Sequence, residues 1–224
     1  PETSLQRSFG GQVLAQGLAA AYRTVPNDRL AHSLNAYFLR PGSPATPILY
    51  VVEITRDGRT FSQRRIVARQ DGRAIFSMVC SFHVHEEGLD HADPLPGDLP
   101  PPEDCRPAAV VLGERSARRA AFWQMEWGAL DVRYVREPSQ AGESGPAHLQ
   151  LWIRAESRLP DDPRVHQMLL AYLSDISLLS VSTVSHPVEF LSPKLQAASI
   201  DHAMWFHRAV RADEWLLYDQ VSPS

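Results

Sequence analysis

Two stretches of the chain combine small and apolar residues at helical spacing, and each precedes shorter runs that are typical of strands. The first stretch, FGGQVLAQGLAAAYRTVPNDR, predicts a helix over about Gln12–Val25 that Pro26 ends. The second, LPDDPRVHQMLLAYLSDISLLSV, predicts a helix over about Pro163–Leu179. We expect Asp162 to cap this second helix, with Pro163 in its first position.

Runs rich in β-branched and aromatic residues follow the first helix: HSLNAYFL, PILYVVEIT, TFSQRRIVARQ and AIFSMVCSFHVH. Asp57-Gly58 and Asp71-Gly72 lie between the later runs and are strong signals for hairpin turns. A stretch rich in proline and acidic residues follows over about His91–Arg106. We then expect strands in FWQMEWGALDVRYV and HLQLWIRAE.

The order helix, strand, strand occurs twice, because HQMLLAYLSDI, SIDHAMWFHR and EWLLYDQ repeat the earlier order. This pattern predicts two α+β repeats, each with a sheet curled around a mostly apolar helix. We place the first repeat at residues 1–90, a Pro-rich linker at 91–118 and the second repeat at 119–224. The second repeat is expected to lack strands that match TFSQRRIVARQ and AIFSMVCSFHVH.

Composition narrows the class of protein. The 224 residues are 44% hydrophobic and 21% charged, which is ordinary for a globular protein. A net charge of -4 gives no basic surface for nucleic acid, and no apolar run is long enough to span a membrane. Cys80 and Cys105 form neither a disulfide framework nor a metal-ligand spacing. Reduced thiols in a cytoplasmic protein are therefore expected.

Asp175 is the sharpest anomaly in the pattern, because it shares a helix face with Met168 and Tyr172 in a helix that should be buried nearly all round. Such a carboxylate is either structural, with donors from a neighbouring strand, or held in a cleft for acid–base chemistry. Ser199 and His202 would point to opposite faces of a strand, so a serine triad has poor geometry. Asp175 is the better partner for Ser199.

Other candidate sites are weaker. His83 and His85 share a strand face, but an exposed strand end running into a polar linker explains them without a metal. Gly10-Gly11 indicates close packing of the first helix, or alternatively a helix N-terminus that faces a ligand. The six arginines over Arg56–Arg73 would ordinarily form a solvated face, although they could also meet a polyanion such as coenzyme A.

Five motifs, in order, resemble the acyl-CoA thioesterase II family: FGGQVLAQGL, HSLNAYFLRPG, RDGRTFSQRRIVARQDG, PDDPRVHQMLLAYLSD and SIDHAMWFHR. The similarity extends over nearly the whole chain and is weakest in the linker. It implies an α+β double hotdog fold, with two tandem repeats that each wrap an antiparallel sheet around a long helix. It also implies hydrolysis of fatty acyl-CoA to free fatty acid and coenzyme A.

The resemblance further implies site residues. The aspartate of YLSD corresponds to Asp175, and the hydroxyl residue before IDH corresponds to Ser199, where many members have threonine. Together with a later glutamine, which would follow Ser224, these residues position the attacking water in the family. The expected substrate is acyl-CoA, and neither a metal nor a redox cofactor is required.

Two alternatives remain. One is a hotdog enoyl-CoA hydratase or dehydratase, which would pair an acidic residue with a nearby histidine; His166 is nine residues from Asp175, too far to share a helix face cleanly. The other is a non-catalytic acyl-CoA-binding domain. A homo-oligomer is expected because hotdog sheets commonly pair edge to edge.

Overall fold

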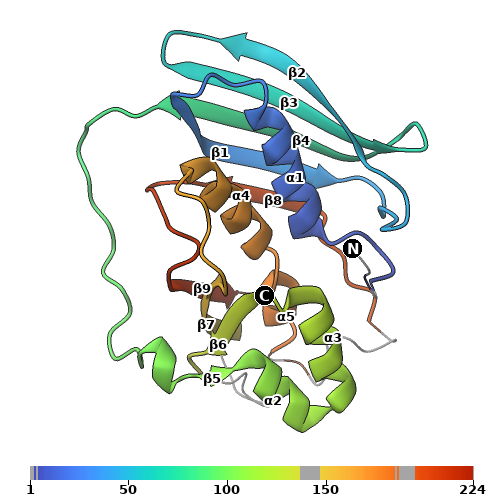
Figure 1. The fold of residues 1–224 in the computed structure, drawn as a ribbon, viewed down its shortest axis with the longest axis vertical. Helices are drawn as coiled ribbons and strands as arrows, with labels where there is room; N and C mark the ends of the chain where they lie inside the picture. The colour runs from blue at the N-terminus through green and yellow to red at the C-terminus, as the bar shows by residue number, and fades with distance from the viewer. Residues whose placement is uncertain (1–2, 4, 137–146, 185, 187–194, 224) are drawn as a thin grey trace.

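The computed structural model describes the chain apart from residues 1–2, 4, 137–146, 185, 187–194 and 224. The first part forms helix α1 (Gly10–Tyr22) and an antiparallel meander of β1 (Arg29–Phe38), β2 (Leu49–Asp57), β3 (Phe61–Gln70) and β4 (Arg73–Val84). Both predicted hairpins are confirmed (Figure 1). Asp71 and Gly72 have φ of 49° and 76°, the left-handed conformation that a tight two-residue hairpin turn requires.

Helix α1 packs against one face of this sheet and forms the first core. Leu14 and Leu18 have no exposed surface and lie in one cluster with Phe76 of β4. The helix begins two residues before the predicted Gln12 and ends three residues before the predicted Val25. It ends early because the Thr24 hydroxyl donates to the Ala21 carbonyl, 2.8 Å away, which closes the last turn.

Arg64 of β3 is fully buried below the C-terminus of α1. Its guanidinium donates to the Thr24 carbonyl at 2.7 Å and forms an ion pair with Asp57 at 2.8 Å. Arg64 is therefore not part of a solvated face, as the arginine-rich pattern suggested. It satisfies backbone groups that the helix end leaves without partners.

The second sheet has the order β5-β6-β7-β9, with β5 (Arg106–Pro107), β6 (Leu130–Tyr134), β7 (Ala147–Ala155) and β9 (Leu216–Ser222). A 3₁₀ turn (Pro102–Asp104) precedes β5, and helices α2 (Ala108–Arg115) and α3 (Ala117–Trp127) follow it. The expected strand over FWQMEWGALDVRYV is wrong in its first half, which is helical. Trp123 and Trp127 lie four residues apart, and their ring centroids are 5.2 Å apart, which is the contact of a helix face.

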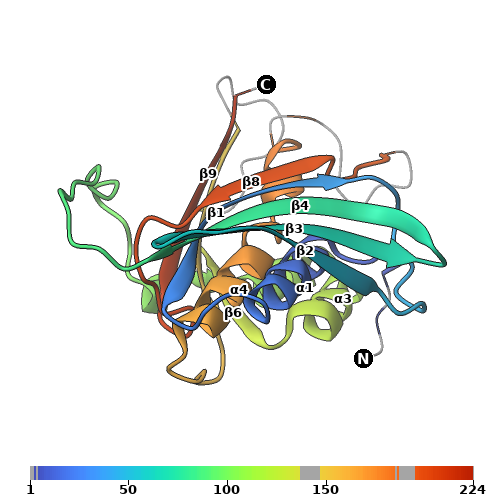
Figure 2. The ribbon, with the colours of Figure 1, turned by 90° about the horizontal axis from the view of Figure 1, so that it is seen from above.

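Helix α4 (Pro163–Leu173) begins as predicted, because the Asp162 carboxylate accepts a hydrogen bond from the Arg164 N–H at 2.9 Å. It ends six residues before the predicted Leu179, and a short helix α5 (Leu178–Val181) follows. We expected a sheet around each helix, and for α4 this is wrong, because α4 packs mainly against α1. Both helices lie on one side of the first sheet (Figure 2).

Strand β8 (Asp201–Trp205) joins the first sheet beside β1, which gives the order β2-β3-β4-β1-β8. Tyr37 pairs with Asp201, and Ser33 pairs with Trp205. The expectation that this strand wraps the helix of its own repeat is therefore wrong. Two strands follow α4 in the described chain, whereas four follow α1 before the 3₁₀ turn.

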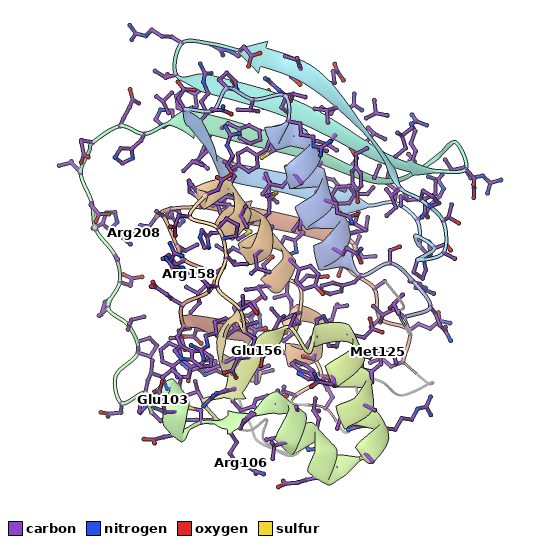
Figure 3. All side chains as sticks on the ribbon, viewed as in Figure 1. Glu103, Arg106, Met125, Glu156, Arg158 and Arg208 are labelled. Atoms are coloured by element: carbon purple, nitrogen blue, oxygen red, sulfur yellow. The ribbon has the colours of Figure 1, made fainter. Side chains whose placement is uncertain are left out.

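The segment between β4 and the 3₁₀ turn has no helix or strand and runs along the outside of the molecule (Figure 1). Arg208, labelled in Figure 3, donates to the Asp90 carboxylate at 2.6 Å and to the His91 carbonyl at 3.1 Å. These contacts join the segment to the chain after β8. Over the described residues, no helix combines the length and apolar character needed to cross a membrane.

Gly11 sets how closely the two helices approach, which predicts a difference between two glycines of α1. A Cβ at Gly11 would lie 2.4 Å from the Tyr172 carbonyl oxygen of α4, a backbone atom that cannot move alone. At Gly17 it would lie 3.3 Å from the terminal methyl group of Met78, which can rotate away. Gly11→Ala should lower the free energy of unfolding by about 1–3 kcal/mol.

Gly17→Ala is the matched control, because alanine is favoured over glycine inside a helix by about 1 kcal/mol. Its free energy of unfolding, measured in urea, should change by no more than about that amount. Equal losses in the two variants would contradict the assignment of Gly11 to the helix contact.

Candidate functional site

Asp175 lies in the turn between α4 and α5, not inside a helix as the sequence pattern predicted. Helix α4 stops at Leu173, with Ser174 as its C-cap. The turn places the Asp175 side chain against the N-terminus of α1, and only 7% of the residue is exposed. The helix ends here because the carboxylate finds its donors outside α4.

Two groups donate hydrogen bonds to the Asp175 carboxylate. The Gly11 N–H, in the first turn of α1, donates to Oδ2 at 2.9 Å, and the Ser199 hydroxyl donates to Oδ1 at 3.1 Å. A Cβ at Gly10 would lie 2.6 Å from Oδ2, so a glycine is needed beside the carboxylate. The predicted proximity of Asp175 and Ser199 is confirmed as a direct hydrogen bond, although Ser199 precedes strand β8 instead of belonging to it.

Burial and hydrogen bonding act in opposite directions on the pKa of Asp175. Burial raises this pKa above the ordinary range of an aspartate, and it is the largest effect. The hydrogen bond from Ser199, the nearby His202 and the Gly11 N–H each lower it, so the net shift is upward. A carboxylate with a raised pKa is a stronger base than one in water.

His202, Ser174 and Tyr218 hold the turn that carries Asp175. The Ser174 hydroxyl donates its single proton to the Ala171 carbonyl at 2.9 Å, so it must accept from Nε2 of His202, also at 2.9 Å. Tyr218 of β9 donates to the Ser174 carbonyl at 2.5 Å. Burial lowers the pKa of His202, which favours the neutral ring. The hydrogen bond to Ser174 then requires the proton of that ring to be on Nε2. His202 therefore supports the site through Ser174.

Asp175 and Ser199 line a cavity of about 1260 Å³ between the two cores. The first core contributes Phe38 and Phe76, and the second contributes Val132, Leu149 and Leu151. Gly10 also lines the cavity, at the start of a helix whose first N–H groups have no acceptor within the helix. One wall therefore combines a base, a hydroxyl and a helix N-terminus in an otherwise mostly apolar space.

The remaining sequence candidates lie elsewhere. Nε2 of His83 lies 2.7 Å from a carboxylate oxygen of Glu86, and His85 forms a hydrogen bond of 3.2 Å with Glu87, so each faces one glutamate. None of the six arginines over Arg56–Arg73 lines the cavity. Gly11 allows the close helix contact, as one interpretation of Gly10-Gly11 predicted, and Gly10 lines the cavity.

Sequence reasoning missed the groups that complete the site. The Gly11 N–H, the Ser174 hydroxyl and the Tyr218 phenol lie in three different elements, and no local pattern links them. The YLSD motif contains Ser174 beside Asp175, and the polar pair at the end of an apolar helix was the one available signal.

Comparisons with known proteins bear on the family and the fold. A family model described as "Acyl-CoA thioesterase" matches residues 123–224, and one described as "Acyl-CoA thioesterase N-terminal domain" matches residues 2–83. The chain is 34% identical to acyl-CoA thioesterase 2 of Haemophilus influenzae over 222 residues, which cover 97% of this chain and 77% of that protein. It is 34% identical to mouse acyl-coenzyme A thioesterase 8, with coverage of 97% and 71%.

Solved structures give the same result for the fold. The crystal structure of an acyl-CoA thioesterase II, TesB2, from Mycobacterium marinum superimposes with a TM-score of 0.82 at 43% identity. The match covers 99% of this chain and 79% of that one. A hotdog-fold protein of Alicyclobacillus acidocaldarius superimposes with a TM-score of 0.70 at 22% identity, and it covers 95% of this chain and 74% of that one. The α+β double hotdog fold class is thus confirmed, although α4 packs mainly against α1 and not inside a sheet of its own.

The raised pKa of Asp175 predicts how stability depends on pH. Because the folded pKa lies above the unfolded value, the folded state favours the protonated acid, and this preference is lost as pH rises through the folded pKa. Asp175→Asn removes the ionisation, and its amide can still accept from Gly11 and face Ser199. Relative to wild type, the variant should become increasingly stable in urea unfolding as pH rises from the ordinary pKa of an aspartate to the raised pKa of Asp175.

Asp201→Asn is the control, because Asp201 is exposed at the start of β8. Its stability difference from wild type should not follow this trend. A loss of stability in Asp175→Asn that grows with pH would show instead that the ionised carboxylate stabilises the fold.

Proposed function

The chain belongs to the acyl-CoA thioesterase family, and we propose that it hydrolyses acyl-CoA thioesters with a water molecule positioned by Asp175 and Ser199. One observation carries this proposal: the carboxylate and the hydroxyl are hydrogen-bonded to each other on the wall of a mostly apolar cavity. The apolar interior suits an acyl chain, and the polar wall suits the thioester carbon.

Hydrogen bonding determines how the water would be held. Ser199 gives its only proton to Asp175, so its lone pairs can accept from the water. The carboxylate has further lone pairs and accepts the second proton of the same water. The oxygen of the water is then free to attack the thioester carbon, while Asp175 removes a proton from it.

The N-terminus of α1 supplies the complementary charge. As the water attacks, negative charge develops on the thioester oxygen, and the first-turn N–H groups beside Gly10 can stabilise it. Collapse of the tetrahedral intermediate breaks the carbon–sulfur bond. The thiolate leaves readily because the pKa of its thiol is about 8.5. It then takes the proton that Asp175 holds, and a free acid and coenzyme A result.

The observed contacts do not favour a hydratase. His166, the histidine considered for that reaction, accepts a hydrogen bond from the Ala212 N–H at 3.1 Å and is not among the described residues that line the cavity. A chain that only binds acyl-CoA would not need a buried carboxylate with a raised pKa in the same cavity.

Two broader features of the protein are also proposed. Cys80 and Cys105 are buried free thiols, which supports a reducing compartment such as the cytoplasm. The outer face of the first sheet exposes Tyr37, Val51 and Trp205, which supports association between copies of the chain.

Substitutions at the two site residues test the mechanism. Asp175→Asn keeps the shape of the side chain but removes the base, so kcat for acyl-CoA should fall by about 10²- to 10⁴-fold. Ser199→Ala should reduce kcat less, because water and backbone donors can partly replace one hydroxyl, and Ser199→Thr should have nearly normal activity. Circular dichroism should show an intact fold in all three variants. Full thioesterase activity in Asp175→Asn would exclude the mechanism.

The pH dependence of kcat/KM gives a separate test of the Asp175–Ser199 hydrogen bond. Activity should fall on the acid side as Asp175 becomes protonated, at a pH above the ordinary pKa of an aspartate. Because the Ser199 hydroxyl lowers the pKa of Asp175, Ser199→Ala should move this acid limb to higher pH. Ser199→Thr keeps a hydroxyl and should leave the limb in place. An unmoved limb in Ser199→Ala would rule out this coupling.

A further inference from the structure

The charges around the cavity differ in sign from those of the whole chain. The net charge of the protein is -4. Among the described residues that line the cavity, however, Asp175 is the one carboxylate, and four residues are arginines: Arg7, Arg40, Arg115 and Arg119. The cavity wall therefore carries excess positive charge in a protein that is negative overall.

The four arginines come from parts of the chain that lie far apart in sequence. Arg7 precedes α1 and Arg40 follows β1, and a hydrogen bond of 2.8 Å from the Ser8 N–H to the Gly42 carbonyl joins these two segments. Arg115 ends α2, and Arg119 lies in the first turn of α3. The fold thus gathers positive charge from both repeats around one cavity.

Three of these side chains have no acidic partner. Within the described part of the chain, Arg7, Arg40 and Arg115 form no ion pair; Arg40 donates to the Ala74 carbonyl at 2.7 Å. By contrast, Arg64 pairs with Asp57, and Arg211 pairs with both Asp161 and Asp213. Arg7, Arg40 and Arg115 thus retain a positive charge that no acidic side chain neutralises, as the binding of an anion would require.

The arginines and the base differ in their exposure to solvent. Arg7, Arg40 and Arg115 are exposed, whereas Asp175 is buried. The positive charges therefore lie at the mouth of the cavity, and the negative charge lies inside it. A ligand that enters this cavity would meet guanidinium groups first and the carboxylate last.

We infer that Arg7, Arg40, Arg115 and Arg119 form a binding site for the phosphate groups of coenzyme A. The inference rests on the proposed function, which places the thioester beside Asp175 and the acyl chain in the apolar interior. Coenzyme A carries a diphosphate and a ribose phosphate at the end remote from its sulfur, so these groups remain at the mouth. Guanidinium groups bind phosphate oxygens through two parallel N–H donors. The arginines over Arg56–Arg73, which were an alternative contact for coenzyme A, do not line the cavity.

Titration calorimetry with free coenzyme A and the full chain tests the site without turnover. The variants are Arg40→Gln and the double variant Arg115→Gln/Arg119→Gln, and Arg73→Gln is the charge-matched control because Arg73 is exposed and does not line the cavity. Arg40→Gln and the double variant should each weaken binding of coenzyme A by about tenfold or more. Arg73→Gln should bind like wild type. Equal affinity in all four proteins, or no binding to wild type, would overturn the inference.

A thioester without phosphates distinguishes this inference from the proposed mechanism. With acyl-CoA, the arginine variants should show a raised KM and little change in kcat. With the corresponding acyl-pantetheine, they should match wild type, and the difference between the two substrates should shrink as salt is added. If the arginine variants had a normal KM for acyl-CoA while hydrolysis still required Asp175, the phosphate site would be wrong and the mechanism would stand. If binding of coenzyme A required the arginines but the protein hydrolysed no acyl-CoA, the mechanism would be wrong and the phosphate site would stand.

Discussion

The hydrogen bond from the Gly11 N–H to the Asp175 carboxylate joins the two repeats at the point where the chemistry is proposed. A helix start in the first repeat donates to a turn in the second, and the positive end of the helix lies beside the negative group. The contact depends on two adjacent glycines. Gly11 lets α4 approach α1, and Gly10 leaves space for the carboxylate oxygen. Substituting either position would move the base as well as the helix.

The surroundings of Asp175 divide into groups that hold it and groups that adjust its basicity. His202 and Tyr218 bind Ser174, and so fix the turn without touching the carboxylate. Ser199 and Gly11 bind the carboxylate itself and, together with the nearby His202, partly offset the effect of burial on its pKa. The base is thus ionisable but still strong. The exposed arginines add positive charge at the mouth, where they can attract an anionic substrate without neutralising the buried base.

The sequence predicted what local patterns control. The hairpins at Asp57-Gly58 and Asp71-Gly72 and the capping of α4 by Asp162 follow from adjacent residues, and they are confirmed. The predicted end of α4 was wrong. Asp175 and Ile176 continue the helical spacing in the sequence, but the Asp175 carboxylate accepts a hydrogen bond from a donor 164 residues away. The pairing of β8 with β1 was missed because strand partners depend on the arrangement of the whole sheet.

The pairing of Asp175 with Ser199 was predictable because each is a polar residue without a local partner beside an apolar helix. The family resemblance pointed to the same two residues. The Gly11 donor and the arginine mouth required the fold, since their members come from separate elements. The aromatic run FWQMEW was predicted to be a strand because its composition is typical of strands. Its spacing fits a helix equally well, and it is helical.

The most direct test of the central claim is a ¹³C NMR titration of the Asp175 carboxyl carbon, assigned by comparison with Asp175→Asn. We expect a pKa above the ordinary value for aspartate, equal within error to the pKa of the acid limb of kcat/KM. An ordinary pKa for Asp175, or an acid limb that does not coincide with its titration, would contradict the assignment of this carboxylate as the base.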